Sequence, residues 1–247
     1  MDKMVYIAAS GAKQSLQGLA LKANNLANAN TTGFKADFAQ ARSMQAFGEG
    51  LPSRVFSMQE RPGSNMTSGG IIETGRDLDI AMSDNAWLAV QDDSGNEAYT
   101  KVGTLNITAQ GMLVTSHGRQ VIGEGGPVIL PVPIEKISFS EDGAIQVRPQ
   151  GAPANFLEEV DTLRVVEGNS RELEKGNDGL FRSVPGQTVD TSANVKVLSG
   201  ALEMSNVNPV HEMVDMINHQ RQFELQVKLM KTAEEIDERQ DQLMRIV

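Results

Sequence analysis

Residues 4–27, MVYIAASGAKQSLQGLALKANNLA, place apolar side chains at steps that alternate between four and three residues. This spacing is typical of a coiled-coil helix, in which one stripe of side chains, the seam, meets a partner helix. We predict a helix with a seam of Val5, Ala9, Ala12, Leu16, Leu19, Ala23 and Leu26. Because many of these side chains are small, a partner helix can approach closely. Turn-prone residues follow at 28–32, and Gly33 ends the segment.

The C-terminal stretch, residues 209–247, contains no Gly and no Pro after its first residue, which predicts a second and longer helix. Pro209 suits the first helical position, and Asn208 suits the cap before it. Its apolar face is too broad for a small domain of the same chain to cover. We predict that it packs against the first helix or against other subunits. The assembly residues that we select on it are Val210, Val214, Ile217, Phe223, Leu225, Leu229, Ile236 and Leu243.

The middle of the chain alternates short β-rich runs with turn signals. The predicted strands are Trp87–Val90, Tyr99–Ile107, Ile137–Ser140, Ala144–Val147, Leu163–Val166 and Val195–Leu198. Turn residues such as Asp142-Gly143 separate them, and no helical period of useful length occurs. This pattern predicts an antiparallel all-β domain.

These segments together predict a multi-domain α+β fold. The N- and C-terminal helices, residues 1–40 with 203–247, pair as a coiled-coil-like domain that flanks a central antiparallel β domain at 75–202. Residues 41–74 are rich in Gly, Ser, Met and Pro, and we interpret them as an extended connector. An ordinary pair of surface helices packed on a globular core is the alternative interpretation.

The composition narrows the function classes. The net charge of −10 disfavours nucleic acid and anionic membranes as partners, and 4% aromatic residues argue against a large aromatic-lined pocket for a small-molecule substrate. Cysteine is absent, which excludes disulfides and thiol catalysis. Lysines dominate the N-terminal segment and acids dominate the C-terminal one, which favours their pairing. The N-terminus lacks the pattern of a cleaved signal peptide, so composition alone indicates a cytoplasmic protein.

No motif points to enzymatic chemistry, a cofactor or a metal. His211 and His219 are eight residues apart rather than the four that would place two metal ligands on one helical turn. The segment Gly123–Val128 lacks the third glycine of a dinucleotide motif and is interpreted as a turn. A glycosidase needs two carboxylates at a set separation, and the chain offers a cluster of aspartates at Asp77, Asp79, Asp84, Asp92 and Asp93. However, acids in or beside turns more often hydrogen-bond locally.

Several blocks resemble bacterial flagellar rod and hook proteins. Residues 24–35, NNLANANTTGFK, resemble the N-terminal signature of these families. Ser205-Asn206-Val207-Asn208 and the residues after it resemble the C-terminal signature. Residues 74–81 and 99–103 are similar to internal blocks of the same proteins. The motif residues are Asn25, Leu26, Ala27, Asn28, Gly33, Phe34, Ser205, Asn206 and Val207.

The resemblance implies a structural subunit of the flagellar basal-body rod. The chain length, Trp87–Val90 and the Gly123–Val128 block are most similar to proximal rod proteins of the FlgF type. Such a subunit transmits torque as part of the drive shaft and forms part of the export channel wall. Its implied partners are other rod subunits, proximal and distal, and the flagellar type III export apparatus. It would span the periplasm within the basal body after export without a cleaved signal, which replaces the cytoplasmic expectation.

Two alternatives remain at this point. The first is a distal rod or hook-type subunit of the same superfamily. The second is a soluble β-rich carbohydrate-binding or hydrolytic module, which a pair of carboxylates in a cleft would favour. Packing of the terminal helices against other chains would favour the rod subunit.

Overall fold

The computed structural model describes the whole chain except residues 1, 40, 46–54, 60–62, 154–155, 187–188, 190–195 and 245–247. The chain divides into two compact units. The helical unit comprises residues 1–27, 37–63 and 208–247, and the β unit comprises residues 28–36 and 64–207. The prediction placed residues 1–40 and 203–247 in the helical domain, whereas the structure assigns 28–36 and 203–207 to the β unit. The predicted connector at 41–74 is divided between the two units after residue 63.

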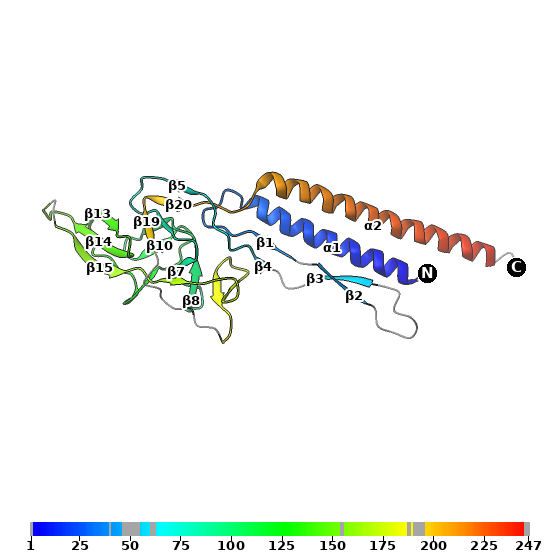
Figure 1. Ribbon diagram of the computed structural model, residues 1–247, viewed down its shortest axis with the longest axis horizontal. Coiled ribbons are helices and arrows are strands. Elements are labelled where there is room, and N and C mark those ends of the chain that lie inside the picture. Colours follow the sequence, from blue (N-terminus) through cyan, green and yellow to red (C-terminus); the bar gives the residue numbers. More distant parts are fainter. Residues whose placement is uncertain are drawn as a thin grey trace. The chain divides into compact units, whose positions relative to one another are not determined.

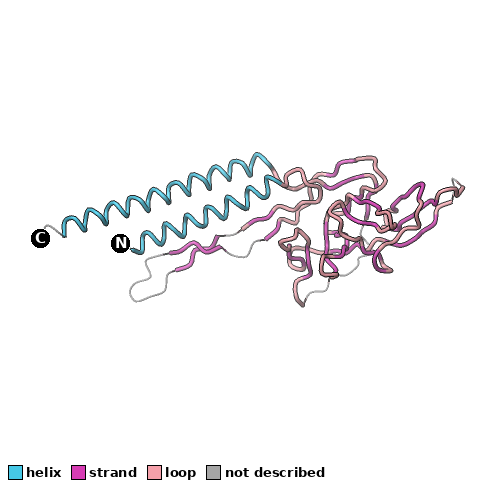
Figure 2. The backbone as a smooth tube through the Cα atoms, turned by 180° about the vertical axis from the view of Figure 1, so that it is seen from behind, coloured by secondary structure: helices cyan, strands magenta, loops and turns pink. Residues whose placement is uncertain are grey.

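Two long helices dominate the helical unit, α1 (Asp2–Ala27) and α2 (Pro209–Met244). Figures 1 and 2 show them running side by side in opposite directions, with the two chain termini at the same end. The Asn208 side chain caps α2, because its Oδ1 accepts hydrogen bonds from the backbone N–H groups of Val210 and His211 at 3.1 and 3.3 Å. The predicted start of α2 at Pro209 is therefore confirmed. No helix among the described residues is long and apolar enough to span a membrane.

A strand pair also belongs to the helical unit. Strand β2 (Ala41–Gln45) pairs antiparallel with β3 (Val55–Gln59), with Ser43 opposite Ser57, and β3 lies near α1. The prediction of an extended connector at 41–74 did not include this pairing. The segment shows no alternation of apolar and polar residues, so pattern reading gave no signal for strands. Two short strands, β1 (Asp37–Phe38) and β4 (Gly63–Ser64), pair in the same part of the sequence.

The β unit is built from short antiparallel strands, as predicted. Its largest sheet has the order β16-β7-β8-β18-β17, and a three-stranded sheet has the order β13-β14-β15. The described strands of this unit, besides part of β4, are β5 (Ile71–Glu73), β6 (Ile80–Met82), β7 (Ala86–Gln91), β8 (Glu97–Thr100), β9 (Leu105–Ile107), β10 (Leu113–Thr115), β11 (Ile122–Gly123), β12 (Gly126–Pro127), β13 (Ile134–Phe139), β14 (Ala144–Pro149), β15 (Glu158–Thr162), β16 (Val165–Glu167), β17 (Leu173–Lys175), β18 (Phe181–Ser183), β19 (Val197–Ser199) and β20 (Ala201–Glu203).

The five-stranded sheet separates two apolar cores. Side chains alternate along β7, so Leu88 and Val90 join the larger core, whereas Trp87 and Ala89 join a smaller one. The smaller core is completed by Tyr99, Val166, Leu173 and Phe181. The Trp87 and Phe181 rings lie with their centroids 4.4 Å apart. Hence one sheet face carries the main core, and the other carries a small aromatic cluster.

One predicted strand is interrupted in the structure. The run Tyr99–Ile107 forms β8 and β9 with a break at residues 101–104. At Gly103 the backbone approaches the Ile80 carbonyl so closely that a Cβ would collide with its oxygen. The predicted turn at Gly123–Val128 is confirmed as the tight antiparallel pairing of β11 with β12.

Candidate assembly interface

The face of α1 that meets α2 is made of small and polar residues. A Cβ added at Gly11 would lie 2.9 Å from the Gln226 amide nitrogen, and one added at Gly18 would lie 2.6 Å from the His219 ring. Ser15, Lys22 and Asn25 continue the same face. We call Gly11, Ser15, Gly18, Lys22 and Asn25 the inner stripe.

The contacts of the inner stripe repeat every seven residues on both helices. Gly11 faces Gln226, Gly18 faces His219, and the Asn25 amide donates a hydrogen bond to a Glu212 carboxylate oxygen at 3.4 Å. On an antiparallel pair, a step of plus seven on one helix therefore matches a step of minus seven on the other. The two glycines leave room for the larger α2 side chains, which fixes the register of the pair.

Charged groups reinforce this register near the end of α1. The Lys22 ammonium lies 3.3 Å from a Glu212 carboxylate oxygen and 2.9 Å from one of Asp215. Burial alone would lower the pKa of Lys22, but the hydrogen bond to Asp215 and the charge of Glu212 outweigh it and raise that pKa. The hydrogen bond from Lys22 also lowers the pKa of Asp215.

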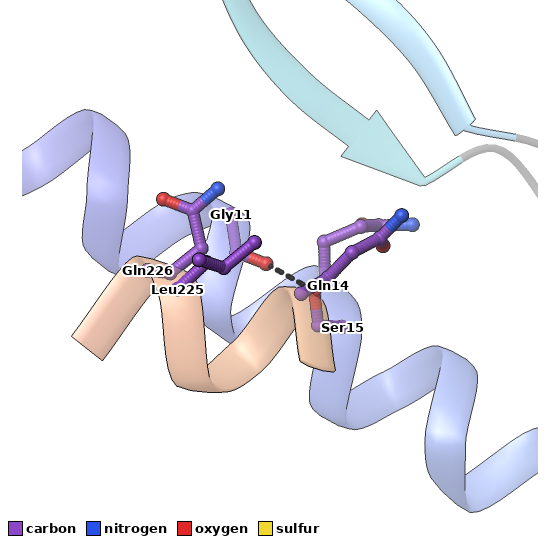
Figure 3. A pocket seen from close by; sticks show the side chains of 6 residues that line it. Gly11, Gln14, Ser15, Leu225 and Gln226 are labelled. Atoms are coloured by element: carbon purple, nitrogen blue, oxygen red, sulfur yellow. Dashed lines mark hydrogen bonds between the residues drawn. The ribbon is translucent and has the colours of Figure 1, made fainter. Parts of the chain in front are cut away.

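A shallow groove of about 220 Å³ lies between the two helices, next to the small inner-stripe residues Gly11 and Ser15. Figure 3 shows Gly11, Gln14 and Ser15 of α1 facing Leu225 and Gln226 of α2 across it. The Ser15 hydroxyl donates to the Gly11 carbonyl at 3.0 Å. The groove therefore presents amide groups and backbone rather than a charged or catalytic cluster.

The predicted seam of α1 lies one residue beyond the inner stripe, which is a rotation of about 100° around the helix. Its members Val5, Leu19 and Leu26 are half-buried and Ala12 is buried. By contrast, Ala9, Leu16 and Ala23 are exposed, with Leu16 at 47%. The pairing with α2 thus uses the neighbouring stripe and leaves part of the apolar seam open.

The selected residues of α2 are also largely open. Those that the structure leaves exposed, at 44–70% of their surface, are Val210, Val214, Ile217, Leu225, Leu229 and Ile236. Phe223 is half-buried, and the side chain of Leu243 falls outside the described residues. Because Glu212, His219 and Gln226 face α1, helical geometry directs Val210, Val214 and Ile217 to the opposite side.

The family-motif residues hold turns and link segments that are distant in sequence. Asn25 exchanges two hydrogen bonds of 2.9 Å with the Asp37 backbone. Within the β unit, the Asn28 side chain accepts from the Thr31 hydroxyl at 3.1 Å. Gly33 has a φ of +69°, and its N–H donates to the Glu203 carbonyl at 2.8 Å. Leu26 is half-buried and Ala27 is exposed.

The C-terminal motif receives the N-terminal one within the β unit. The Asn206 amide oxygen accepts from the Ala36 N–H at 2.8 Å, and its nitrogen donates to the carbonyls of Asn65 and Thr67 at 2.8 Å each. The Ser205 hydroxyl accepts from the buried Val207 N–H at 3.3 Å. The Lys175 ammonium lies over the Phe34 ring, 4.1 Å from its centroid.

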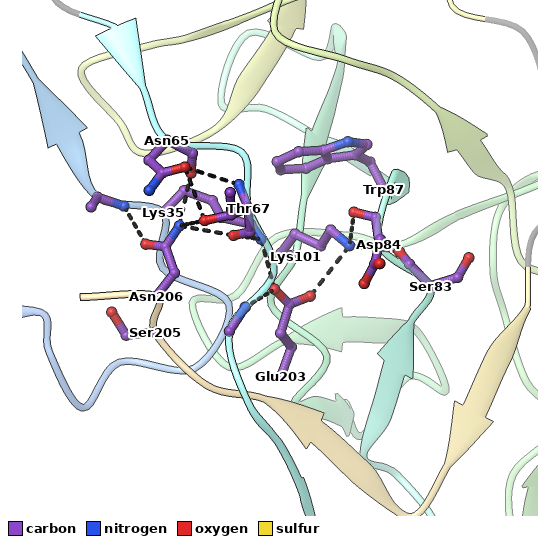
Figure 4. A network of polar contacts seen from close by, with 12 residues as sticks. Lys35, Asn65, Thr67, Ser83, Asp84, Trp87, Lys101, Glu203, Ser205 and Asn206 are labelled. Carbon is purple, nitrogen blue, oxygen red and sulfur yellow. Dashed lines mark hydrogen bonds and ion pairs between the residues drawn. The ribbon is translucent and has the colours of Figure 1, made fainter. Parts of the chain in front are cut away.

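A buried cluster of charges lies beside this junction (Figure 4). The Glu203 carboxylate binds the Lys35 ammonium at 2.6 Å and the Lys101 ammonium at 3.2 Å, and the three side chains are at most 2% exposed. Lys35 also donates to the Thr67 carbonyl at 3.0 Å, and Lys101 donates to the carbonyls of Ser83 and Asp84 at 2.8 and 3.0 Å. We call Lys35, Lys101 and Glu203 the charge cluster.

The charge cluster is held against the aromatic face of the five-stranded sheet. The Lys35 and Lys101 ammoniums lie 5.9 and 5.4 Å from the centroid of the Trp87 ring. Burial lowers the pKa of Lys101 to about 8, although the Glu203 charge acts in the opposite direction. Two lysine side chains thus share one carboxylate in a buried site.

Sequence reasoning quoted Lys35 and Lys101 inside motifs, and Glu203 lies just before the C-terminal motif. The opposite charges of the two terminal segments favoured their pairing, but the sequence did not predict a buried cluster of these three residues. A lysine next to Phe34, and another between Thr100 and Val102, were the available signals. Their pairing with Glu203 spans 168 residues in the case of Lys35, so no local pattern indicates it.

The aspartates considered for catalysis take local roles. Asp79 is 4% exposed and accepts from the Thr74 hydroxyl at 2.8 Å. Asp92 accepts from the backbone N–H groups of Ser94 and Asn96 at 2.9 Å each, as in a turn. Within the described ranges, no group of three or more acidic or histidine side chains is placed to hold a metal ion.

Comparison with known proteins extends these observations to the whole chain. Three family profiles match it: flagella basal body rod protein at residues 5–35, flagellar hook protein FlgE/F/G D1 domain at 81–147, and flagellar basal body rod FlgEFG protein C-terminal at 198–243. The flagellar basal-body rod protein FlgF of Escherichia coli is 38% identical over 99% of both chains, and that of Salmonella typhimurium is 37% identical over the same share. The rod protein FlgG of Agrobacterium fabrum is 30% identical over 95% of this chain and 96% of its own.

Proposed function

The chain belongs to the flagellar basal-body rod protein family, as a structural subunit of the FlgF type, and we propose that its open helical faces bind the helices of neighbouring rod subunits. In this proposal the helical unit builds the rod, transmits torque as part of the drive shaft and contributes to the wall of the export channel. The inner stripe holds α1 and α2 together within one chain, and the exposed apolar residues serve contacts between chains.

The exposed face of α2 is the observation that carries this proposal. Val210, Leu225 and Ile236 are 70%, 61% and 44% exposed along a helix of 36 residues, which is about 54 Å long. Apolar side chains spread over such a length are typical of a surface that another protein covers. Burial of the surface that is still exposed contributes about 0.7–2 kcal/mol per side chain to association, before the entropy of assembly is subtracted.

α2 is longer than α1, and this difference supports contacts between subunits that follow one another along the helix axis. The seven-residue contact pattern places the first turn of α1 opposite the turn around Ala233, so α2 continues beyond the start of α1 in both views of the chain. We propose that this extension packs on a neighbouring subunit. A helix end without a partner is marginal in water, because helical stability comes mainly from packing.

The position within the rod is also part of the proposal. The FlgF proteins of Escherichia coli and Salmonella typhimurium share more identity with this chain than the FlgG protein of Agrobacterium fabrum, which favours the proximal rod over the distal rod or the hook. Neighbours would be other proximal and distal rod proteins, within the part of the basal body that spans the periplasm. The chain would reach this place through the flagellar type III export apparatus without cleavage of a signal peptide.

The test is incorporation into basal bodies. Leu16→Asp and Leu225→Asp each place a charge on an exposed apolar residue, so the isolated protein keeps its fold. In cells that lack the natural copy, we expect each variant to be exported but to be absent from purified basal bodies, with loss of swimming. Burying an unpaired charge in a packed interface opposes assembly.

Gln17→Asp is the matched control for Leu16→Asp, because Gln17 is exposed on the same turn but is polar. We expect it to support swimming. Normal incorporation of both Leu variants would show that these faces stay open in the rod, and would refute the proposed interface.

A β-rich hydrolase is the second candidate from the sequence, but Asp79 and Asp92 make local hydrogen bonds instead. We expect the purified chain to release no fragments from peptidoglycan, as measured by chromatography of the products. Turnover that is abolished by Asp77→Asn or Asp79→Asn would overturn the structural assignment.

A further inference from the structure

The smaller core of the β unit has a polar cover, and the last part of that cover to be synthesised is Glu203. Trp87, Tyr99 and Phe181 form an aromatic face on one side of the five-stranded sheet. Figure 4 shows Lys35, Lys101 and Thr67 near Trp87, with Glu203 reaching both ammoniums.

Glu203 is the counter-ion of both ammonium groups in this cover. Its Oε1 accepts from Lys35 at 2.6 Å and from the Gly69 N–H at 3.0 Å, and its Oε2 lies 3.2 Å from Lys101. Without this carboxylate, two ammonium groups would be buried with backbone carbonyls as their partners. A buried charge that loses its counter-ion is strongly destabilising, more so than the pair itself is stabilising.

Glu203 is far in sequence from the residues that it contacts in this cover. Lys35 and Glu203 are 168 residues apart, and Gly69 and Glu203 are 134 apart. The sheet β13-β14-β15 is built from consecutive antiparallel strands, so its contacts are local. Closing a long loop has a higher entropic cost, and local contacts form before distant ones.

We infer that Glu203 is a latch: the aromatic face of the five-stranded sheet stays open until the segment 200–207 joins the β unit, and one carboxylate closes it. A chain that is delivered N-terminus first keeps this face incomplete until nearly all of it has emerged. The latch depends only on residues of the β unit, so it holds whether or not the proposed rod contacts are right.

The test compares Glu203→Gln with Glu73→Gln in the full-length protein. Glu73 is an exposed carboxylate on β5, the strand that pairs with β20, so it controls for loss of one acid in the same ladder. The readouts are hydrogen exchange by region and the fluorescence of Trp87, which is the single tryptophan of the chain.

In Glu203→Gln we expect amides of residues 34–36, 66–69 and 84–90 to exchange about 100-fold faster, while β13 and β14 keep their protection. Acrylamide should then quench Trp87 readily. In refolding of the natural protein, protection of β13 and β14 should precede burial of Trp87. The Glu73→Gln protein should match the natural one in every measurement.

If Glu203→Gln does not fold, two further variants decide the question. Glu203→Asp keeps the charge on a shorter side chain, and we expect an intermediate opening of the aromatic face. The triple variant Lys35→Met, Lys101→Met, Glu203→Leu replaces the charge cluster by apolar groups. We expect the aromatic face to be covered in this variant as in the natural protein. Equal loss of protection in β13, β14 and the Trp87 region, or no loss at all, would overturn the latch.

Discussion

The two units of this protein bury different kinds of side chain. In the β unit, Leu88, Leu113 and Ile145 are fully buried and the polar exceptions are paired. In the helical unit, α1 and α2 meet through glycine, polar and charged groups, and their buried apolar residues are alanines, while Leu16, Val210 and Leu225 stay exposed. The β unit thus buries its apolar side chains within one chain, whereas the helical unit leaves large apolar side chains exposed.

This difference indicates that the two units obtain their stability from different sources. Apolar burial is the main favourable contribution to folding, and the β unit has it within one chain. The helical unit gains comparable burial only if other helices cover its outer faces. The comparison leads to four expectations, from the largest effect to the smallest.

The largest effect concerns the free monomer. We expect amides in the central strands β7, β8 and β14 to exchange at least about 1,000-fold more slowly than amides in α1 and α2. The reason is that the helices lack a partner for their apolar faces in solution. Hydrogen exchange of the purified monomer measures this, and equal protection of helices and strands would contradict the distinction between the units.

Truncation of one leucine in each unit should have unequal effects. Leu88→Ala leaves a cavity in the main core and should lower the free energy of unfolding of the β unit by about 2–5 kcal/mol. Leu225→Ala removes an exposed side chain and should change monomer stability by less than about 0.5 kcal/mol. Denaturant titration compares the two, and a large effect of Leu225→Ala would show that α2 is already packed in the monomer.

The charge cluster should make the β unit more stable in mild alkali. The pKa of Lys101 is lowered from 10.5 to about 8, so between these values the unfolded chain binds a proton that the folded chain has released. Stability should therefore rise with pH across this window, by on the order of 3 kcal/mol. Lys101→Met should remove the slope, as followed by denaturant titration at several pH values.

The control for that slope is Lys196→Met, because the Lys196 side chain is 77% exposed. It should leave the pH dependence unchanged. A slope that persists without Lys101 would assign it to another group.

The smallest effect concerns the register of α1 and α2. In Gly18→Ala the new methyl group would meet the His219 ring, and we expect a loss of about 1–3 kcal/mol from the helix pair, reduced by the higher helix propensity of alanine. The double variant Gly18→Ala, His219→Ala should recover stability. Circular dichroism of the helical signal against temperature measures both, and an undiminished loss in the double variant would disprove this contact.

The sequence alone predicted the two terminal helices and the antiparallel character of the β unit, but not the pairing of β2 with β3. The four-three spacing identified α1, and the Asn208-Pro209 pair identified the start of α2, because capping and periodicity act over a few residues. The turn residues Asp142-Gly143 marked the β unit for the same reason. The terminal motifs indicated the family, because each motif is a short continuous stretch that is recognised without the structure.

The tertiary structure decided how these elements use their surfaces. Apolar periodicity indicated one seam on α1, but the structure pairs the adjacent stripe of Gly11, Ser15 and Gly18 with α2, since small side chains allow the closest approach. Similarly, Lys35 and Lys101 look like surface lysines until Glu203 is placed beside them. Such pairings join residues far apart in the chain, and local physical rules carry no information about them.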